Sequence, residues 1–280
     1  MATAPQNDVL LLGAGGKLGR MVRAAWPVVS DRRLVPVTRG AGDGALRWVP
    51  GTPHGDLPRV GAVVALWGVT GRAPDALAMN SYLAEQAQSL AIALGATRVI
   101  HCSSAAVYAP ADTPVSEVTD LAPFTPYGQA KLAMERRLAE LSDAQIATTV
   151  LRIGNVAGAE SLFANMRPGG CVTLDRFPSG RGPWRTYIGP TDLARVIAAM
   201  LEAPAAVVDR IFNVGAPSPV CMDDIARAGG CHIDWRSAPD TAIERLVLDT
   251  ARLGEICPLP MSSADPACIA EDARTGGIWP

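Results

Sequence analysis

The sequence predicts an α/β fold in which a doubly wound parallel sheet is followed by a small C-terminal substrate lobe. In the first 153 residues, short aliphatic and β-branched runs alternate with longer runs of helical periodicity, which is typical of βαβ units. A glycine-rich segment follows the first short run and opens the first helical run. After Gly154 this rhythm is lost, and residues 154–190 are rich in Gly, Pro and Arg, the composition of loops.

Each predicted strand is a short apolar run bounded by turn residues, and the strands are expected at 9–12, 34–38, 62–66, 98–103, 148–153 and 210–214. Pro36 cannot donate to a strand ladder, which argues against a central position for the second strand. The predicted helices alternate with the strands and are expected at 17–26, 75–94, 127–141 and 191–201. Pro27 is expected to stop the first helix and Gly95 the second.

Charge and hydropathy exclude several classes of protein. The 280 residues carry 25 basic and 27 acidic side chains, so no basic excess is available to bind nucleic acid. No apolar run approaches the about 18 residues of a membrane-spanning helix, and residues 1–8 lack the basic start of a secretory signal. The six cysteines include no Cys-x-x-Cys pair and the three histidines are far apart, so we expect free thiols in a reducing cytoplasm and no metal site.

The glycine-rich segment 13–19 predicts a dinucleotide site of the Rossmann type. Glycines at 13, 16 and 19 allow a tight turn, close approach of a pyrophosphate and close packing of the helix on the sheet. The helix that begins there offers free N–H groups and a positive dipole end to the anion. The expected cofactor contacts are Gly13, Gly16, Lys17, Leu18 and Gly19; a plain strand-to-helix turn is the alternative.

The end of the second predicted strand indicates which dinucleotide is bound. NAD-binding proteins usually carry an Asp or Glu there, whereas this chain has Arg39 and no carboxylate. A guanidinium matches the geometry of a 2′-phosphate, which favours NADP, with NAD as the other possibility. A solvated loop arginine is the alternative reading of Arg39.

Tyr127 and Lys131 stand four residues apart at the start of a predicted helix and therefore share a face. An ammonium near a phenol lowers a pKa that is otherwise about 10, so the tyrosine can move a proton near neutral pH. The preceding strand ends at Ser103 and Ser104, and ligands gather beyond the carboxyl ends of parallel strands. A serine hydroxyl there can hydrogen-bond a substrate oxygen; capping or turn formation is the alternative.

In this order and spacing the motifs resemble those of the extended short-chain dehydrogenase/reductases, which include the NAD-dependent epimerase/dehydratases. The resemblance covers most of the chain and rests on segments 13–19, 80, 103–108, 127–131, 151–158, 185–194 and 212–215. It implies that Tyr127 is the catalytic acid/base, that Lys131 lowers its pKa and binds the ribose, and that Ser104 orients the substrate. It also implies that Asn80 supports the active-site helix.

Other positions narrow the chemistry that the resemblance implies. Ala105 and Ala106 stand where the sugar dehydratases of the family carry acidic residues, so dehydration is disfavoured. Nucleotide-sugar enzymes of the family tend to have a longer insertion than the about 30 residues that separate Gly154 from Arg185 here, so the resemblance implies a pocket for something smaller than a full nucleotide sugar. Arg185 is either a ligand of a substrate phosphate or, more simply, a solvated loop residue, and Asp192 is read as a helix N-terminal residue.

The resemblance implies a cytoplasmic NADP- or NAD-dependent oxidoreductase. It would transfer a hydride to or from a carbonyl or alcohol carbon of a sugar-like or other small polar substrate. One alternative is an epimerase that transiently oxidises a sugar or nucleotide sugar; another is a non-catalytic NAD(P)-sensing protein, because a fold does not fix a function. A homodimer through helices 75–94 and 127–141 is a further expectation from the resemblance.

The predicted domains follow from the same pattern. The dinucleotide-binding domain is expected over residues 1–153, with 186–214 returning to it. The small substrate-binding lobe is expected over 154–185 and 215–280.

Overall fold

A computed structural model describes residues 7–40, 42, 44–71, 73–141, 143, 145–275 and 279. Its centre is a seven-stranded sheet in the order β11-β6-β5-β4-β1-β2-β3, in which every neighbouring pair is parallel. The strands are β1 (Val9–Leu12), β2 (Leu34–Thr38), β3 (Leu46–Arg47), β4 (Ala62–Ala65), β5 (Arg98–Ser104), β6 (Ala147–Ile153) and β11 (Ile211–Val214). The predicted Rossmann-type doubly wound sheet is therefore confirmed.

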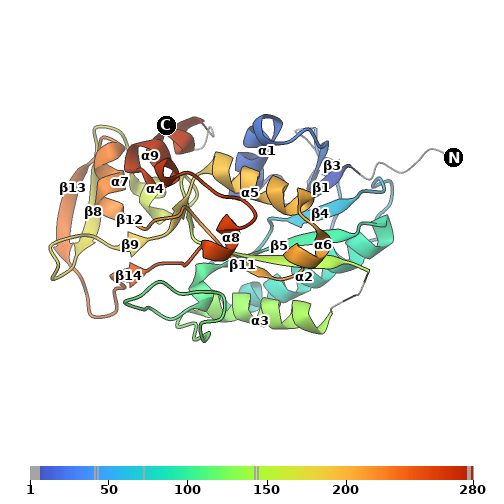
Figure 1. Cartoon of the computed structure of the whole chain (residues 1–280), viewed down its shortest axis with the longest axis horizontal. Helices are drawn as coiled ribbons and strands as arrows, with labels where there is room; N and C mark the ends of the chain where they lie inside the picture. The colour runs from blue at the N-terminus through green and yellow to red at the C-terminus, as the bar shows by residue number, and fades with distance from the viewer. Residues whose placement is uncertain are drawn as a thin grey trace.

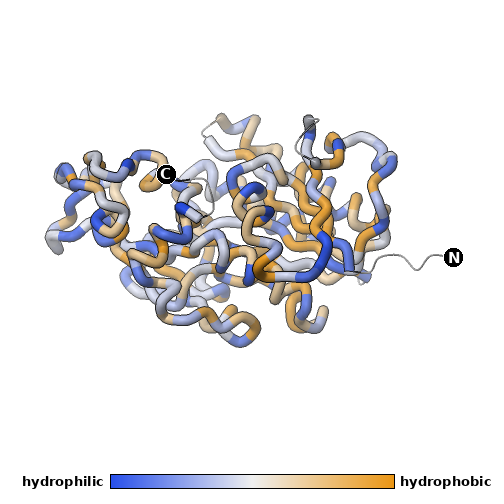
Figure 2. The backbone as a smooth tube through the Cα atoms, turned by 90° about the horizontal axis from the view of Figure 1, so that it is seen from above, coloured by the Kyte–Doolittle hydropathy of each residue, from blue (hydrophilic) through white to orange (hydrophobic). Residues whose placement is uncertain are grey.

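Helices cover both faces of this sheet (Figure 1). One face carries α1 (Lys17–Val29), α5 (Pro190–Glu202) and α6 (Ala205–Val208), and the other carries α2 (Pro74–Leu94) and α3 (Pro126–Glu140). With both faces covered, a strand can be apolar at every position, and all four residues of β1 are 0% exposed. Figure 2 shows hydrophobic segments of the backbone running through the half of the molecule that holds this sheet.

The strand order reverses beside β1, with β4 on one side and β2 on the other. Helix α1 leaves the end of β1 for one face of the sheet, and α2 leaves the end of β4 for the opposite face. In open α/β sheets this divergence leaves a crevice at the carboxyl ends of the strands, where ligands bind. The glycine-rich segment and the serines at the end of β5 both lie at this edge.

Pro27 and Pro36 both lie inside regular elements. The prediction that Pro27 stops the first helix is wrong, because α1 continues to Val29. Pro27 removes only the one bond that its own N–H would make, and the helix end is anchored beside it, because Trp26 is 3% exposed and donates from Nε1 to the carbonyl of Arg32 at 2.8 Å. Pro36 lies in β2 where no outer strand pairs with it, since β3 contacts only Val37 and Thr38.

Residues 154–190 contain more regular structure than the predicted loops. They form β7 (Asn155–Val156), α4 (Ser161–Asn165), β8 (Cys171–Arg176), β9 (Trp184–Arg185) and β10 (Tyr187–Ile188). Strand β8 pairs in parallel with β13 (His232–Ser237), and Val172 and Leu174 point into the lobe's own core. The prediction of loops alone is thus wrong here, because β8 gains its partner from a distant segment that local composition does not reveal.

The rest of the lobe is built from short elements at one end of the molecule (Figure 1). Strand β9 lies between β12 (Val220–Cys221) and β14 (Arg245–Leu246), while β7 pairs with β10. Helices α7 (Met222–Ala228), α8 (Ala251–Gly254) and α9 (Pro266–Thr275) and the 3-10 turns η1 (Ala105–Val107) and η2 (Met261–Ala264) complete the described fold. The division into two domains stays a prediction.

Helix α9 contacts α5, one of the helices that cover the central sheet. Its Asp272 accepts hydrogen bonds from the main-chain N–H and the hydroxyl of Thr191, at 3.0 and 2.5 Å, in the first turn of α5. Asp192, read from sequence as a helix N-terminal residue, does lie in the first turn of α5, where it pairs with Arg195 on the same helix. Over the described part of the chain, none of the helices is long and apolar enough to cross a membrane.

Candidate active site

The glycine-rich turn between β1 and α1 is closed by the main chain. Gly13 has φ +81°, a left-handed conformation that favours glycine, and its carbonyl accepts from the N–H of Gly16 at 2.9 Å. A Cβ at Gly19 would stand 2.7 Å from the Cα of Ala14, so only glycine lets α1 pack this close to the turn. Gly16 caps α1 with no side-chain hydrogen bond. These features fit a pyrophosphate cradled by main-chain N–H groups.

Lys17 and Leu18 are the first two residues of α1, and their surroundings differ. Leu18 is partly buried against the core between α1 and the sheet. The exposed Lys17 donates from Nζ to the carbonyl of Ala159 at 3.2 Å and so links the glycine turn to the segment after β7. The cofactor turn is therefore tied directly to the lobe.

Arg39 lies exposed just beyond β2, a position that agrees with both interpretations from the sequence, a ligand of a 2′-phosphate and a solvated loop arginine. Two further arginines, to which sequence reasoning gave no role, lie near this corner. Arg47 donates from Nε to the carbonyl of Arg39 at 3.3 Å, and Arg20 donates from Nη1 to the carbonyl of Gly15 at 2.5 Å. A basic residue directly after Gly19 was the available signal for Arg20.

Ser104 and Tyr127, which are 23 positions apart in the sequence, come together at the end of β5. Tyr127 lies in the first turn of α3, which begins after Thr125 because the Thr125 hydroxyl accepts from the N–H of Gly128 at 3.0 Å. The Ser104 hydroxyl accepts from the N–H of Ala106 at 3.2 Å and lies near the Tyr127 phenol, whose pKa it acts to lower. Ser104 thus caps a turn and lies beside the tyrosine.

The predicted lowering of the Tyr127 pKa by Lys131 is not seen in the structure. Burial raises the pKa of the phenol, the neighbouring Cys102 raises it further, and the nearby Ser104 hydroxyl opposes them only in part. The physical reason lies in the geometry: Lys131 Nζ is 5.9 Å from the centre of the Tyr127 ring and donates instead to the carbonyl of Cys102 at 2.8 Å.

Lys131 is 2% exposed, and burial lowers the pKa of its ammonium. It lies beside Gly68, just beyond β4, where a Cβ would stand 3.2 Å from Nζ and 3.0 Å from Oδ1 of Asn80. Asn80 accepts from the N–H of Val69 and donates to its carbonyl, both at 3.1 Å. Asn80 therefore anchors the turn after β4 to α2, next to Lys131, which gives physical content to its implied supporting role.

Ser103 points toward α3, to side chains whose role sequence reasoning missed. Its hydroxyl donates to Oε1 of Glu135 at 2.5 Å, and Glu135 pairs with Arg152 at 2.7 Å. Glu135 and Arg152 are 6% and 2% exposed. An arginine within the otherwise apolar strand β6 was the signal that could have revealed this buried pair.

Arg185 faces main-chain carbonyls. Its guanidinium donates to the carbonyls of Trp184, Ile243 and Glu244 at 2.7, 2.9 and 3.2 Å. Burial lowers the pKa of Arg185. These bonds hold β14 against β9, so the residue is neither the solvated loop arginine nor, in this structure, a group turned toward a phosphate.

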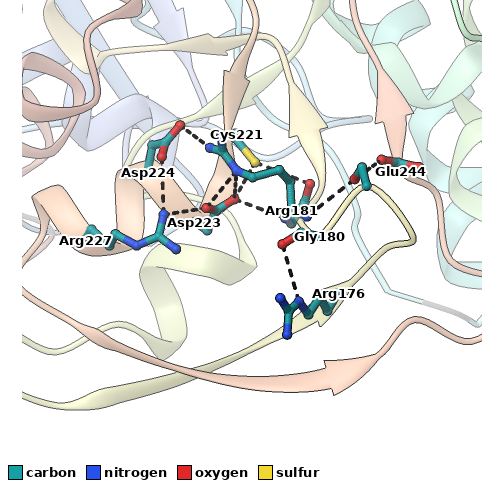
Figure 3. A network of polar contacts seen from close by, with 10 residues as sticks. Arg176, Gly180, Arg181, Cys221, Asp223, Asp224, Arg227 and Glu244 are labelled. Carbon is teal, nitrogen blue, oxygen red and sulfur yellow. Dashed lines mark hydrogen bonds and ion pairs between the residues drawn. The ribbon is translucent and has the colours of Figure 1, made fainter.

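A second buried carboxylate organises the lobe (Figure 3). Asp223, 0% exposed, accepts from Nε of Arg181 at 3.1 Å, from Arg227 at 2.5 Å and from the N–H of Gly182 at 3.1 Å. Arg181 also reaches Asp224 at 2.5 Å. This network ties the turn between β8 and β9 to α7 and so fixes where β9 begins. Within the described residues, no group of His, Cys, Asp or Glu could hold a metal ion.

The sequence was compared with protein-family models and with curated proteins. Residues 60–215 match the model of the NAD dependent epimerase/dehydratase family. No curated protein sequence matches the chain.

Solved structures with a similar fold extend over nearly the whole chain. MoeE5 in complex with UDP-glucuronic acid and NAD is 22% identical, with a TM-score of 0.74 over 95% of this chain and 99% of the other. The UDP-glucuronic acid 4-epimerase of Bacillus cereus, in complex with a fluorinated UDP-sugar and NAD, is 16% identical, with a TM-score of 0.78 over 96% and 99%. A UDP-galactose 4-epimerase is 17% identical, with a TM-score of 0.74 over 96% and 98%.

Proposed function

The chain belongs to the NAD dependent epimerase/dehydratase family, and from this premise we propose that Ser104, Tyr127 and Lys131 are the catalytic residues of an NAD(P)-dependent oxidoreductase. The substrate would be a sugar-like or other small polar molecule with a carbonyl or alcohol carbon. The observation that carries the proposal is that Ser104, at the carboxyl end of β5, lies near the Tyr127 phenol, with Lys131 one helical turn away from Tyr127.

Each of the three residues has one task in this proposal. The phenol oxygen of Tyr127 gives a proton to the substrate oxygen during reduction and takes it back during oxidation. Ser104 holds the same substrate oxygen through its hydroxyl, and Lys131 holds a ribose hydroxyl of the cofactor. The nicotinamide, when bound, supplies or accepts the hydride. Because burial raises the pKa of Tyr127 in the structure without ligand, the phenol is poised as the proton donor.

Tyr127→Phe tests the proposal, because it removes the reacting oxygen and keeps the ring. We expect kcat to fall by about 10²- to 10⁴-fold, the usual contribution of general acid–base catalysis. Turnover is followed by nicotinamide absorbance with small sugars, UDP-glucose and UDP-glucuronic acid as candidate substrates. Tyr82→Phe, on the half-buried part of α2, is the matched control. A Tyr127→Phe enzyme with more than a tenth of the normal kcat contradicts the assignment.

The cofactor contacts are proposed to be Gly13, Gly16, Lys17, Leu18 and Gly19 with the pyrophosphate, and Arg39 with a 2′-phosphate. The turn geometry supports the first set. The exposed position of Arg39 beyond β2 supports a preference for NADP over NAD.

Arg39→Ala tests the cofactor preference. A charge-assisted hydrogen bond contributes about 1.5–3 kcal/mol, so the Kd for NADP should rise about ten- to a hundredfold while the Kd for NAD stays within twofold. Calorimetric titration measures both, and Arg236→Ala, an exposed arginine on β13 in the lobe, is the control. Equal weakening of NAD and NADP would remove the basis for NADP.

An epimerase with a tightly held cofactor is the second candidate function. The similar folds of two 4-epimerases, at TM-scores of 0.78 and 0.74, favour it. It would use the same residues, with the substrate oxidised and then reduced on the opposite face. Purified protein that retains nicotinamide and interconverts sugar epimers with no net absorbance change would establish it; exchange of free cofactor at every turnover would exclude it.

The substrate is proposed to be smaller than a full nucleotide sugar. The short segment between β7 and β9 supports this, as does Arg185, whose guanidinium is taken up by three main-chain carbonyls rather than presented to a diphosphate. A higher kcat/KM with UDP-sugars than with small sugars would overturn this part of the proposal.

A homodimer and a cytoplasmic location complete the proposal. Helices α2 and α3 lie side by side on one face of the sheet, where Met79 and Ile92 of α2 are exposed at 41% and 54%. These two helices offer the surface for a second copy, which light scattering after size exclusion would detect. The six cysteines are free thiols in the structure, which supports a reducing compartment.

A further inference from the structure

Three ionisable side chains lie together in the core beside the proposed active site. Lys131 and Arg152 are 2% exposed and Glu135 is 6% exposed. Removing such charges from water is expensive unless they are well paired and hydrogen-bonded. The proposed reaction uses Lys131 alone, so the burial of the other two requires its own explanation.

Glu135 and Lys131, one turn apart on α3, form hydrogen bonds with two consecutive residues of β5. Lys131 Nζ donates to the carbonyl of Cys102 at 2.8 Å, and the hydroxyl of Ser103 donates to Oε1 of Glu135 at 2.5 Å. The two contacts form a closed ring, since both begin on the same helical turn and end on adjacent residues. Ser104, the next residue of β5, carries the hydroxyl that lies near Tyr127.

Arg152 fixes the Glu135 carboxylate from the opposite side. Its Nη2 lies 2.7 Å from Oε2, and its Nε lies 3.1 Å from both carboxylate oxygens. Nη1 of Arg152 donates to the Tyr108 hydroxyl at 2.8 Å, which in turn donates to Oδ1 of Asn213 at 2.7 Å. The carboxylate is therefore held rigidly against β5, β6 and β11.

Glu135 lies one turn after Lys131 on α3, and its charge, after that of Cys102, opposes the lowering of the Lys131 pKa by burial. From β5, Cys102 is kept neutral because burial raises the pKa of its thiol, and His101 is kept neutral because burial lowers its pKa to about 3. From α3, Tyr127 is neutral because burial raises its pKa. On the side of β4 and α2, Lys131 faces the uncharged Gly68 and Asn80. Cys102 and Glu135 are thus the two groups that raise the Lys131 pKa, and of these Glu135 is the one held in an ion pair.

We propose that Glu135 is a positioning residue that holds the Lys131 ammonium in place and keeps it protonated, with Arg152 and Ser103 fixing the carboxylate for this purpose. This inference rests on the proposed function for its catalytic consequence, because Lys131 is proposed to serve Tyr127 and the cofactor. Its electrostatic part concerns the protein without ligand and can be measured there.

The chain offers an unusually clean measurement, because Lys17 and Lys131 are its two lysines among 25 basic residues. Protein labelled with ¹³C at lysine Cε gives two side-chain signals, and their titration by NMR reports each pKa. An opposite charge at close range shifts a pKa by about 1–3 units. Glu135→Gln should therefore lower the Lys131 pKa by about one unit or more and leave Lys17 unchanged as the internal reference.

Two further variants keep the test decisive. Glu135→Gln leaves Arg152 buried without its anion and can unfold the protein, whereas Glu135→Gln with Arg152→Gln leaves neither charge behind. In the folded double variant the Lys131 pKa should fall in the same direction. Glu140→Gln, on the exposed end of α3, is the matched control and should change nothing. A Lys131 pKa within 0.3 unit of the wild type in the double variant, a limit of about 0.4 kcal/mol, overturns the proposal.

The enzyme assay separates this inference from the proposed function. If Tyr127→Phe abolishes turnover, the alkaline limb of the kcat/KM profile of the double variant should move to lower pH by the same amount as the Lys131 pKa. A lowered Lys131 pKa with an unmoved alkaline limb overturns the catalytic part of the inference. A lowered Lys131 pKa together with an active Tyr127→Phe enzyme supports the positioning by Glu135 and refutes the proposed function alone.

Discussion

Replacing Gly68 with alanine is expected to damage the active site while sparing the fold. Gly68 is exposed beyond β4, and a Cβ there would stand 3.0 Å from Oδ1 of Asn80 and 3.2 Å from Nζ of Lys131. Neither neighbour can yield easily. Asn80 is 1% exposed and makes three hydrogen bonds to the main chain, and Lys131 is 2% exposed and bonded to Cys102.

The size of the effect follows from these distances. Ordinary contacts begin at 3.4 Å, so the ammonium must move by a few tenths of an ångström. A misplacement of about 1 Å costs about a hundredfold in rate, so we expect kcat/KM to fall about tenfold, which corresponds to about 1.4 kcal/mol. Stability should change by no more than about 1–2 kcal/mol, because the strain is partly offset by the stiffer unfolded chain.

Two measurements check this prediction. The Kd for NADPH, from the fluorescence of the bound nicotinamide, needs no known substrate and should rise about tenfold, equivalent to about 1.4 kcal/mol. Thermal unfolding should show a Tm within about 4–8 °C of the wild type. Gly254→Ala is the control, since a Cβ there meets nothing within 4 Å. An unchanged Kd for Gly68→Ala, or an equal rise in Gly254→Ala, refutes the reasoning.

Three further predictions concern stability. Burial lowers the pKa of His101 to about 3, below its unfolded value of 6.5, so the unfolded chain gains the proton first and stability is lost as the pH falls below about 6.5. By pH 5 the loss is about 2 kcal/mol, and urea unfolding at pH 7.5 and 5 should show that much less pH dependence in His101→Asn. Gly19→Ala should lower the free energy of unfolding by about 1–3 kcal/mol and weaken cofactor binding in calorimetry, because its Cβ meets the backbone of Ala14 at 2.7 Å; unimpaired binding would contradict this. Asp272→Ala should cost about 1 kcal/mol, or about 2–4 °C in Tm, through the lost cap on α5, whereas the exposed Glu271→Ala should not.

The central sheet could be predicted because its strands carry their own signal. Six of the seven strands were expected as short runs rich in apolar residues between turn residues, and βαβ alternation then predicts parallel pairing; the two-residue strand β3 was not expected. Strand β8 could not be predicted in the same way. Its buried face carries only Val172 and Leu174, and its partner β13 follows it by about 60 residues, so residue composition gives no trace of that pairing.

The candidate site likewise contains residues that could be predicted from the sequence and residues that could not. The spacing of Tyr127 and Lys131 and the serines at the end of β5 were visible because each depends on one element. Glu135 and Arg152 received no role, since their pairing exists only where α3 crosses β6. The predicted direction of the Tyr127 pKa shift was wrong for a related reason. The Lys131 ammonium donates to the carbonyl of Cys102, and a main-chain acceptor cannot be recognised from a sequence motif.

The contact between Asp272 and Thr191 has a consequence for folding during synthesis. The last strand of the central sheet, β11, ends at Val214, yet the first turn of α5 obtains its carboxylate from a residue near the other end of the lobe. A nascent chain halted between these two points would hold a sheet with all seven strands and a helix whose first turn is still frayed. The two halves of the molecule should therefore reach their final stability together, at a late stage of synthesis on the ribosome.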